Sequence, residues 1–178
     1  MKLYLARHTQ TDYNLEKRLN SDYSVNISLN KTGTKQAMKL AKKLAAEKFD
    51  VIFTSELLRT QQTAQYINKF HDVPIIVDKR LNENVSGFEG QLITTHLNAL
   101  NKSSDKWQEK FNDGESLEEA RNRAGDFLKY LQTTDYQAVL VITHGYIVES
   151  MYGIIQKLGY EEASKFECAQ GDFIVFDY

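Results

Sequence analysis

Short apolar runs alternate with longer amphipathic stretches along most of this chain. The apolar runs predict strands at residues 2–6, 50–53, 74–77, 138–143 and 173–176. Apolar positions at helical spacing predict helices at residues 32–48, 56–70, 91–100, 117–132 and 146–158. Because strands that alternate with helices are typical of α/β proteins, we expect a mostly parallel sheet with helices on both faces, a three-layer α-β-α sandwich.

Two of these elements carry additional signals. The run from Val139 to Ile142 is apolar at every position, as expected of a central strand buried on both faces. Ser116 and Glu119 have the Ser-x-x-Glu spacing of a capping box, which predicts a helix start at this point. Residues 80–115 show a weaker pattern, so only the helix at 91–100 is predicted there.

The length of 178 residues predicts one domain that spans residues 1–178 and buries a core. Hydrophobic residues make up 42% and the net charge is −2, which argues against a nucleic-acid or membrane partner. Lysines between residues 31 and 48 flank an apolar stripe and predict a solvated helix face. No signal peptide opens the chain and no apolar run approaches the roughly 20 residues that cross a bilayer, so we expect a cytoplasmic protein.

The cysteine count and two of the histidines have simple interpretations. Cys168 is the single cysteine, which excludes an intrachain disulfide and a multi-cysteine metal site, and we expect a buried or idle thiol. His71 and His96 are expected to be exposed loop or helix residues.

The other two histidines follow the ends of apolar runs. His8 comes directly after Arg7 at the end of the first strand, and His144 lies before Gly145 at the end of the strand at 138–143. Ligands bind at this edge of open α/β sheets, so the sequence predicts two halves of one anion pocket. Gly145 would let backbone approach closely.

Phosphoryl chemistry fits these residue types. The imidazole of His8 offers a nitrogen nucleophile near neutral pH, while Arg7 and Arg59 can hold phosphoryl oxygens bidentately. Arg59 lies near the start of the helix at 56–70, where the helix N-terminus favours an anion. His144 can donate to the same oxygens. Positioning and charge neutralisation are the main requirements of phosphoryl transfer.

A proton donor for the leaving oxygen is also needed. Glu83, in the loop after the third strand, is the first candidate, because a carboxyl group in a pocket can have a raised pKa. Glu89 is the rival candidate and Glu115 a weaker one.

Several segments match one family in order. The segment RHTQTDYN at residues 7–14 resembles an Arg-His-Gly-Glu/Gln-Thr-x-x-Asn signature. Residues 29–37 resemble a Leu-Thr-x-x-Gly-x-x-Gln-Ala helix entry, and residues 54–64 are similar to Ser-x-Leu-x-Arg-x-x-Gln-Thr-Ala. Further matches follow at residues 81–83, 114–116 with Arg123, and 143–145. Together, from residue 3 to about 148, the chain resembles the phosphoglycerate mutase-like histidine phosphatase superfamily.

The resemblance implies a phosphoglycerate mutase-like fold and a set of roles. His8 would be the phosphorylated nucleophile, and Arg7, Arg59 and His144 would bind the phosphoryl group. Glu83 would be the acid of the first step and the base of the second. Further substrate contacts are expected from Thr9, Gln10, Asn14, Arg18 and Gly145. No metal or organic cofactor is implied, and the partner would be a small phosphorylated metabolite.

Three departures from the family pattern affect these expectations. Thr9 replaces the usual glycine after the histidine, where its side chain could crowd the phosphate or its hydroxyl could add a hydrogen bond. The segment 83–90 is one residue short, which bears on the assignment of Glu83. Glu149 stands where arginine is common, a change at the pocket rim.

The leading hypothesis is a phosphatase that hydrolyses a small-molecule phosphomonoester through a phosphohistidine. One alternative is phosphoglycerate mutase activity, although such mutases usually have longer chains. A second is a phosphate-ligand-binding protein with weak catalysis, motivated by Thr9 and the short loop. A third, a metal hydrolase using His8 and His144, needs further ligands that the sequence does not place. Residues 15–28 and 84–113, with Arg18, Tyr23, Phe88, His96, Trp107 and Phe111, are expected to form the rim. The substrate and the oligomeric state stay open.

Overall fold

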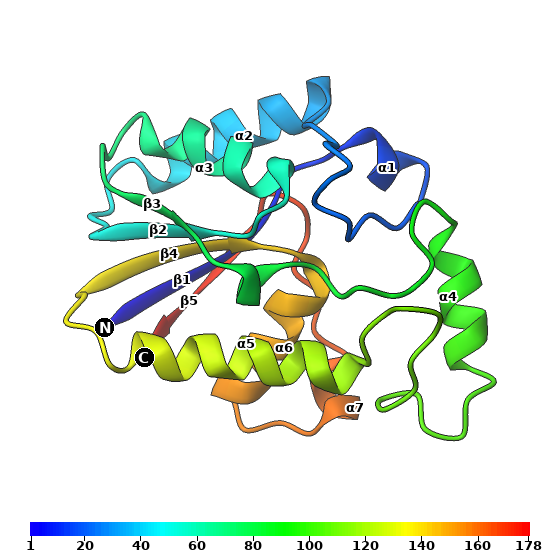
Figure 1. The fold of residues 1–178 in the computed structure, drawn as a ribbon. Coiled ribbons are helices and arrows are strands. Elements are labelled where there is room, and N and C mark those ends of the chain that lie inside the picture. Colours follow the sequence, from blue (N-terminus) through cyan, green and yellow to red (C-terminus); the bar gives the residue numbers. More distant parts are fainter.

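The computed structural model describes residues 1–178, and five strands form its central sheet (Figure 1). The strands are β1 (Lys2–Arg7), β2 (Val51–Thr54), β3 (Ile75–Val77), β4 (Ala138–Thr143) and β5 (Phe173–Asp177). Their order is β3-β2-β4-β1-β5, and only β5 runs antiparallel to its neighbour. The mostly parallel sheet that the sequence predicts is therefore confirmed, and β4 is its central strand.

Helices cover both faces of the sheet. They are α1 (Asp12–Leu15), α2 (Lys31–Leu44), α3 (Leu58–Asn68), α4 (Ile93–Leu100), α5 (Leu117–Leu131), α6 (Gly145–Ile155) and α7 (Tyr160–Ala163). A 3₁₀ turn spans Lys79–Leu81. In Figure 1, α2 and α3 lie above the sheet and α5 and α6 lie below it, which confirms the three layers.

The predicted boundaries of several helices were wrong. The helix expected at 146–158 ends at Ile155, and the one expected at 91–100 begins at Ile93. The helix expected at 32–48 ends at Leu44, because the chain turns there and places Phe49 against Tyr4, with ring centroids 5.0 Å apart. The helix expected at 56–70 begins only at Leu58. The two four-residue helices α1 and α7 and the 3₁₀ turn were not predicted, since none is long enough to show a helical period.

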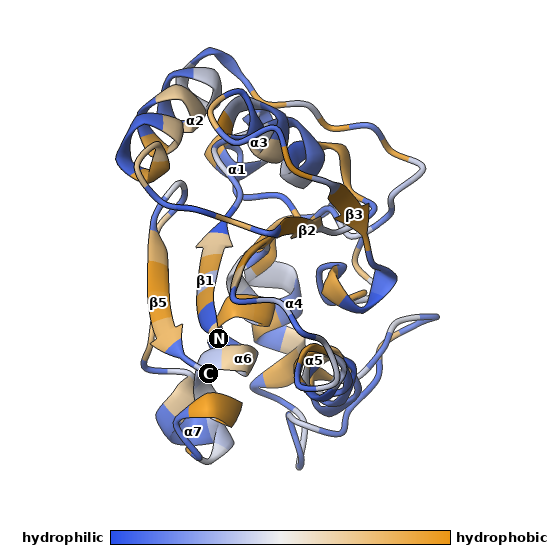
Figure 2. Cartoon of the chain, turned by 90° about the vertical axis from the view of Figure 1, so that its left-hand side faces the viewer, coloured by the Kyte–Doolittle hydropathy of each residue, from blue (hydrophilic) through white to orange (hydrophobic).

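Alternate side chains of the central strands β1, β2 and β4 enter two different cores. Leu3 and Leu5 of β1 pack in the cluster between the sheet and the pair α5 and α6, whereas Tyr4 and Ala6 pack between the sheet and the pair α2 and α3. Figure 2 shows these apolar strands between the two helical layers. This burial on both faces explains why the strands appear in the sequence as continuous apolar runs.

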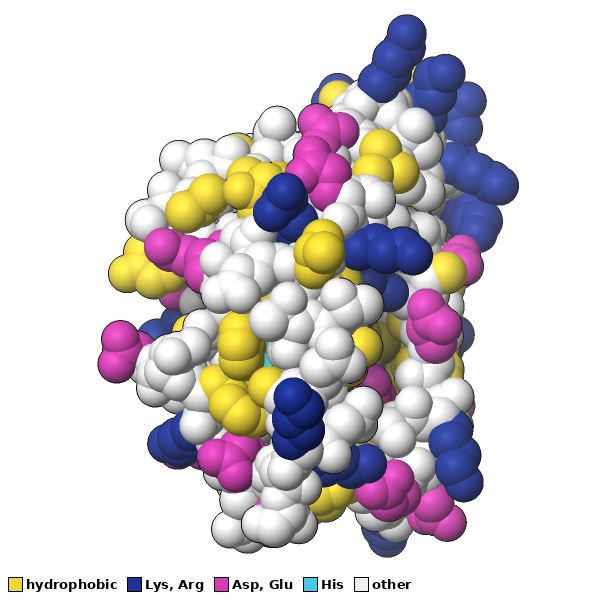
Figure 3. Space-filling model, turned by 90° about the vertical axis from the view of Figure 1, so that its right-hand side faces the viewer, with side chains coloured by type: hydrophobic (Ala, Val, Ile, Leu, Met, Phe, Trp, Pro, Cys, Tyr) yellow, Lys and Arg dark blue, Asp and Glu magenta, His cyan; other side chains and the backbone are white.

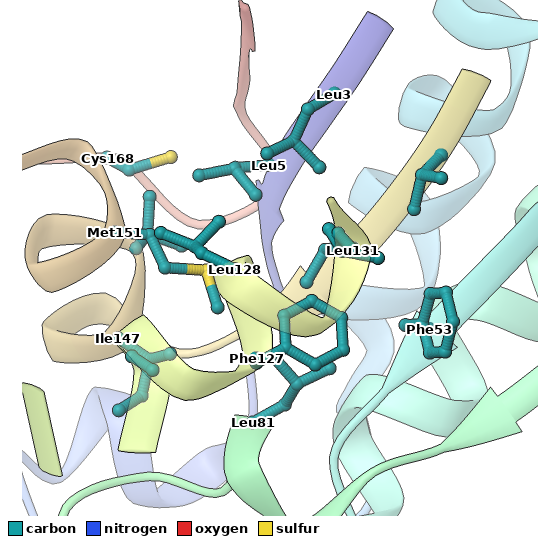
Figure 4. Close-up of a cluster of buried hydrophobic side chains, with 14 of the residues drawn as sticks. Leu3, Leu5, Phe53, Leu81, Phe127, Leu128, Leu131, Ile147, Met151 and Cys168 are labelled. Atoms are coloured by element: carbon teal, nitrogen blue, oxygen red, sulfur yellow. The ribbon is translucent and has the colours of Figure 1, made fainter. Parts of the chain in front are cut away.

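The larger core lies between the sheet and the pair α5 and α6. Phe53 of β2 contacts Phe127 of α5 edge to face at 5.2 Å, and Met151 of α6 lies in the same cluster (Figure 4). Cys168 is buried at its border, as expected. The capping box of Ser116 and Glu119 is confirmed at the start of α5.

The surface differs from the sequence prediction at one histidine. The lysines of the segment 31–48 are all exposed, as predicted, and Figure 3 shows cationic side chains gathered along one edge of the molecule. His71 is half-exposed, but His96 is buried, contrary to prediction, because its ring packs against Phe88 and Phe111. No helix of the structure is both long and apolar enough to cross a membrane.

The topology creates a crevice at one end of the sheet. The chain leaves β1 through α2 towards β2, and it leaves β4 through α6 towards β5 on the other side. The two connections diverge from neighbouring strands, which is the arrangement that opens a ligand site at the carboxyl ends of parallel strands. In Figure 1, α4 and the long loops beside it stand at this end of the sheet.

Candidate active site

The pairing of β1 with β4 brings the two predicted histidines together. Arg7 lies opposite Thr143 in the parallel register, and the backbone N–H of His8 donates to the carbonyl of Thr143 at 2.9 Å. His8 and His144 therefore leave the sheet side by side, with ring centroids 5.1 Å apart. Both rings are buried, at 2% and 0% exposure.

Hydrogen bonds define the protonation state of His8. Its Nδ1 lies 2.7 Å from the carbonyl oxygen of Thr9, which can only accept, so Nδ1 carries the proton. Its Nε2 accepts a hydrogen bond from Nε of Arg59 at 3.1 Å. Burial, followed by the charge of Arg59, holds the pKa of His8 well below its usual value. His8 is thus a neutral imidazole whose Nε2 lone pair is bound by the Nε–H of Arg59 in this structure.

His144 has the opposite tautomer. An arginine can only donate, so the contact between Nη2 of Arg59 and Nδ1 of His144, at 3.0 Å, makes Nδ1 the acceptor. The Nε2–H of His144 then donates to Oγ of Ser55 at 2.8 Å. Ser55 also accepts from the backbone N–H of Leu57 and contacts the hydroxyl of Thr60. Burial and Arg59 keep the pKa of His144 well below its usual value as well.

Arg59 is the residue that joins these groups. It lies in the first turn of α3 and is 5% exposed. Besides the two histidines, its guanidinium donates to the side-chain oxygen of Asn20 at 2.6 Å and to the Asn20 carbonyl at 2.8 Å. Burial lowers the pKa of Arg59 to about 10, so it remains a cation at neutral pH. Asn20 was not predicted as a site residue, because it lies in a loop without periodic pattern.

Arg7 approaches the site from the other side. Its Nη1 donates to the carbonyl of Cys168 at 3.0 Å, while its Nε is buried and donates to no protein group. The guanidinium lies against Gly145, where a Cβ would come within 3.1 Å of Cζ of Arg7. Gly145 was expected to let backbone approach closely. In the structure it instead makes room for the Arg7 side chain. Gly145 also begins α6, whose N-terminal N–H groups favour an anion.

Glu83 lies at the same pocket, two residues after the 3₁₀ turn. Burial raises the pKa of its carboxyl despite the opposing charges of Arg59, Arg7 and Arg123. Its Oε1 accepts from the backbone N–H of Asn84 at 3.0 Å, and Arg123 of α5 donates to its carbonyl at 3.1 Å. A carboxyl with a raised pKa keeps its proton to a higher pH than usual and can donate it.

The rival glutamates occupy different positions. Glu89 accepts four hydrogen bonds from residues 20–22, among them the Asn20 side chain at 2.9 Å and the Ser21 backbone N–H at 2.7 Å. It does not line the pocket of His8. Glu115 forms an ion pair with Arg123 at 2.6 Å. Both carboxylates hold the surrounding loops.

Three of the residues expected to contact the phosphoryl group or the substrate do not line the pocket. One is His144, which is fully buried with Nδ1 bound by Arg59 and Nε2 by Ser55. Thr9 is fully buried, and its hydroxyl lies 3.3 Å from that of Thr63, so the side chain neither crowds the pocket nor donates into it. The backbone N–H of Gln10 donates to Gln36, and the Gln10 side chain accepts from Asn30. Both residues were expected to bind substrate, and neither lines the pocket, because tertiary neighbours hold them on the far side of the loop.

Asn14 and Arg18 do line the pocket, at its rim. Oδ1 of Asn14 accepts from the backbone N–H of Thr11 in the capping box of α1. Arg18 donates to Glu16 and to the carbonyl of Gly90, both at 2.7 Å. These contacts join the segment 12–20 to the segment around Gly90.

The pocket has a volume of about 360 Å³ and extends from His8 to α4. His96 and Trp107 line it, as the rim prediction expected, whereas Phe88 and Phe111 pack behind His96. Tyr23 lines a separate hollow. On the face that carries α4, hydrophobic side chains gather beside a small area of histidine surface (Figure 3). No three His, Cys, Asp or Glu side chains are grouped so that they could hold a metal ion.

Comparison with known proteins gives consistent results. The model of the histidine phosphatase superfamily (branch 1) matches residues 3–178. Phosphoserine phosphatase 1 of Hydrogenobacter thermophilus is 29% identical over 98% of this chain and 85% of that protein. A probable phosphoglycerate mutase of Cronobacter sakazakii is 30% identical over 82% of this chain and 70% of its own length. The crystal structure of the α-ribazole phosphatase from Shigella flexneri, 25% identical, superposes with a TM-score of 0.86 over 99% of this chain and 90% of that one.

Proposed function

The chain belongs to the histidine phosphatase superfamily, and on this premise we propose that it hydrolyses small-molecule phosphomonoesters through a phosphohistidine on His8. The observation that carries the proposal is the hydrogen bonding of the His8 ring. The Thr9 carbonyl holds the proton on Nδ1, so the lone pair is on Nε2, where the Nε–H of Arg59 binds it until an incoming phosphoryl group takes that place. A neutral imidazole oriented in this way can act as a nucleophile without a separate base.

In the first step, Nε2 of His8 attacks phosphorus while the bond to the alcohol oxygen breaks. Arg7 and Arg59 line the pocket and would hold the phosphoryl oxygens, and the unpaired Nε–H of Arg7 is available to one of them. We propose that His144, whose Nε2–H contacts Ser55 in the structure, turns this donor to the same oxygens when substrate binds. Glu83 gives its proton to the departing alcohol oxygen, as its raised pKa allows. The products of this step are a free alcohol, a phosphohistidine and a Glu83 carboxylate.

In the second step, water attacks the phosphohistidine and the P–N bond breaks. The Glu83 carboxylate takes a proton from this water, which restores its acid form, and Nε2 of His8 recovers its lone pair. The net reaction converts a phosphomonoester and water into an alcohol and inorganic phosphate. Two cations, Arg7 and Arg59, neutralise the phosphoryl charge, so we propose that no metal ion takes part.

Single-turnover labelling tests this mechanism. A phosphomonoester with a labelled phosphoryl group should transfer the label to the wild-type protein as an acid-labile, base-stable adduct. His8→Ala should take up none, whereas the matched control His71→Ala, outside the pocket, should be labelled like the wild type. Equal labelling of wild type and His8→Ala would contradict the proposal. Turnover of p-nitrophenyl phosphate should survive a strong chelator, and its loss would overturn metal independence.

The relative described as a probable phosphoglycerate mutase motivates one competing outcome. If the purified protein interconverted 2- and 3-phosphoglycerate much faster than it hydrolysed any ester, mutase activity would replace phosphatase activity as the function. Absence of turnover with every phosphomonoester tested, together with intact vanadate binding, would instead favour a phosphate-ligand-binding protein. We propose that residues 1–178 form a single histidine phosphatase domain.

A further inference from the structure

Glu149 is the one carboxylate lining the pocket, other than Glu83. It lies on α6, four residues after Gly145, is half-buried, and makes no hydrogen bond or ion pair in the structure. Glu83 is its acidic neighbour and Arg121 its basic one. Burial, followed by the repulsion between the two carboxylates when both are ionised, raises the pKa of Glu149 to about 7. The carboxyl group thus faces the pocket without a protein partner.

No free cation balances this carboxylate in the outer pocket. Arg18 lines the rim, but its guanidinium is engaged with Glu16 and with the Gly90 carbonyl. Arg121 donates to the Leu158 carbonyl and stacks over Tyr160, and it does not line the pocket. A substrate carboxylate or second phosphate would therefore meet no unpaired positive group beyond those at His8.

The remaining walls of the outer pocket are largely apolar. They come from α4, from the segment before α5 and its first residue, and from the first turn of α6, and the side chains are Ile93, Leu97, Leu100, Trp107, Leu117 and Tyr146. Ile93 and Leu97 remain 38% and 48% exposed, so apolar surface is available for contact. Such walls favour an alcohol with an apolar face.

We propose that Glu149 determines specificity, selecting phosphomonoesters whose alcohol part is neutral or cationic and excluding those that carry a carboxylate or a second phosphate. The inference rests on the proposed function, because it concerns the leaving alcohol of that reaction. An ammonium or hydroxyl group of the alcohol donates to the unpartnered carboxylate. A substrate carboxylate instead adds a third acidic group beside Glu83 and Glu149, which like-charge repulsion disfavours in a half-buried pocket.

Two substrates that differ by one carboxylate test this directly. O-Phosphoethanolamine and O-phosphoserine share the amine and the phosphate, and only phosphoserine carries the carboxylate. We expect the wild-type kcat/KM to favour phosphoethanolamine by about tenfold or more near pH 8, where Glu149 is mostly ionised. Glu149→Gln should reduce that ratio, and Glu149→Arg should reverse it. The exposed control Glu162→Gln should leave it unchanged.

Phenyl phosphate, whose alcohol part is apolar and uncharged, separates the specificity role of Glu149 from the proposed phosphatase function. Its kcat/KM should change less than about threefold in Glu149→Gln, because only a charged or hydrogen-bonding alcohol needs the carboxylate. Equal wild-type rates for phosphoethanolamine and phosphoserine, or a ratio unaffected by both Glu149 variants, would overturn the specificity role. If phenyl phosphate hydrolysis were independent of His8, the proposed function itself would fail. Glu149→Gln is nearly isosteric, so it carries the test even if Glu149→Arg does not fold.

Discussion

The Nε of Arg59 donates a hydrogen bond to the Nε2 of His8 at 3.1 Å, so a cation lies directly against the nitrogen that we propose as the nucleophile. A protonated His8 would face that cation, which is one reason why its pKa lies well below its usual value; burial is the larger one. The same guanidinium holds His144 and Asn20. Arg59 therefore keeps both histidines neutral and fixes their orientation.

The buried histidines predict a loss of stability in acid. A histidine whose pKa is lower in the folded protein binds its proton more readily in the unfolded chain. The free energy of unfolding therefore falls as the pH drops below about 6.5, by up to about 1.4 kcal/mol per pH unit for each such histidine. His144→Gln removes one of the two, so its stability should depend less steeply on pH between about 6.5 and 5.

Urea denaturation of both proteins across this pH range measures the difference. Glu149, whose pKa is raised to about 7, contributes a pH dependence of opposite sign. It is present in wild type and variant alike, so it cancels in the comparison. Parallel stability curves for the two proteins would show that His144 does not change its pKa on folding.

Glu83→Gln should lower kcat by about a hundredfold or more, since it removes the proton that the leaving oxygen needs. Vanadate binding should change little, because the phosphoryl oxygens contact Arg7, Arg59 and His144 in the proposed mechanism. The split between kcat and vanadate affinity, measured by steady-state kinetics and inhibition, identifies a proton-transfer role. An unchanged kcat would move the acid to another group, and Glu149 would be the next to test.

The sequence predicted the strands well and the short helices poorly, for a physical reason. Strands β1 and β4 are buried on both faces, so each is an uninterrupted apolar run whose end is visible in the sequence. The parallel-strand rule then placed His8 and His144 at one edge. Helices α1 and α7 have four residues each, too few to repeat an apolar stripe. His96 showed no sign of burial, because its neighbours Phe88 and Phe111 are distant in sequence.

The sequence could not predict which way the side chains of the loops point. Thr9 follows His8 directly, yet its side chain contacts Thr63 of α3, since the chain turns after β1. Glu89 was the rival candidate for the proton donor, and only the folded loop at residues 20–22 shows that its carboxylate accepts four hydrogen bonds there. Such contacts depend on where separate loops meet, which no local pattern encodes.

Asn20→Ala should weaken the phosphate site without touching the nucleophile. It removes the side-chain acceptor for Arg59 and leaves a buried guanidinium N–H unpaired, which costs about 1–3 kcal/mol. Arg59 becomes less well oriented, so vanadate should bind more weakly and the midpoint of thermal unfolding should fall. Glu89→Gln should show a milder form of both effects, because Glu89 holds Asn20. Glu109→Gln, at an exposed position, is the control. Unchanged vanadate affinity in Asn20→Ala would mean that Arg59 needs no such support.

Gly145→Ala should disturb Arg7 through a single methyl group. The added Cβ would lie 3.1 Å from Cζ and 3.3 Å from Nη2 of Arg7, so the guanidinium has to move away from α6. Because Arg7 also donates to the Cys168 carbonyl, that movement strains a second contact. We expect vanadate affinity and kcat/KM to fall about tenfold or more, since a misplaced phosphate ligand weakens binding and transition state together. Gly159→Ala is the matched control, because a Cβ there meets nothing within 4 Å. Wild-type kinetics in Gly145→Ala would show that Arg7 does not need this position to act on phosphate.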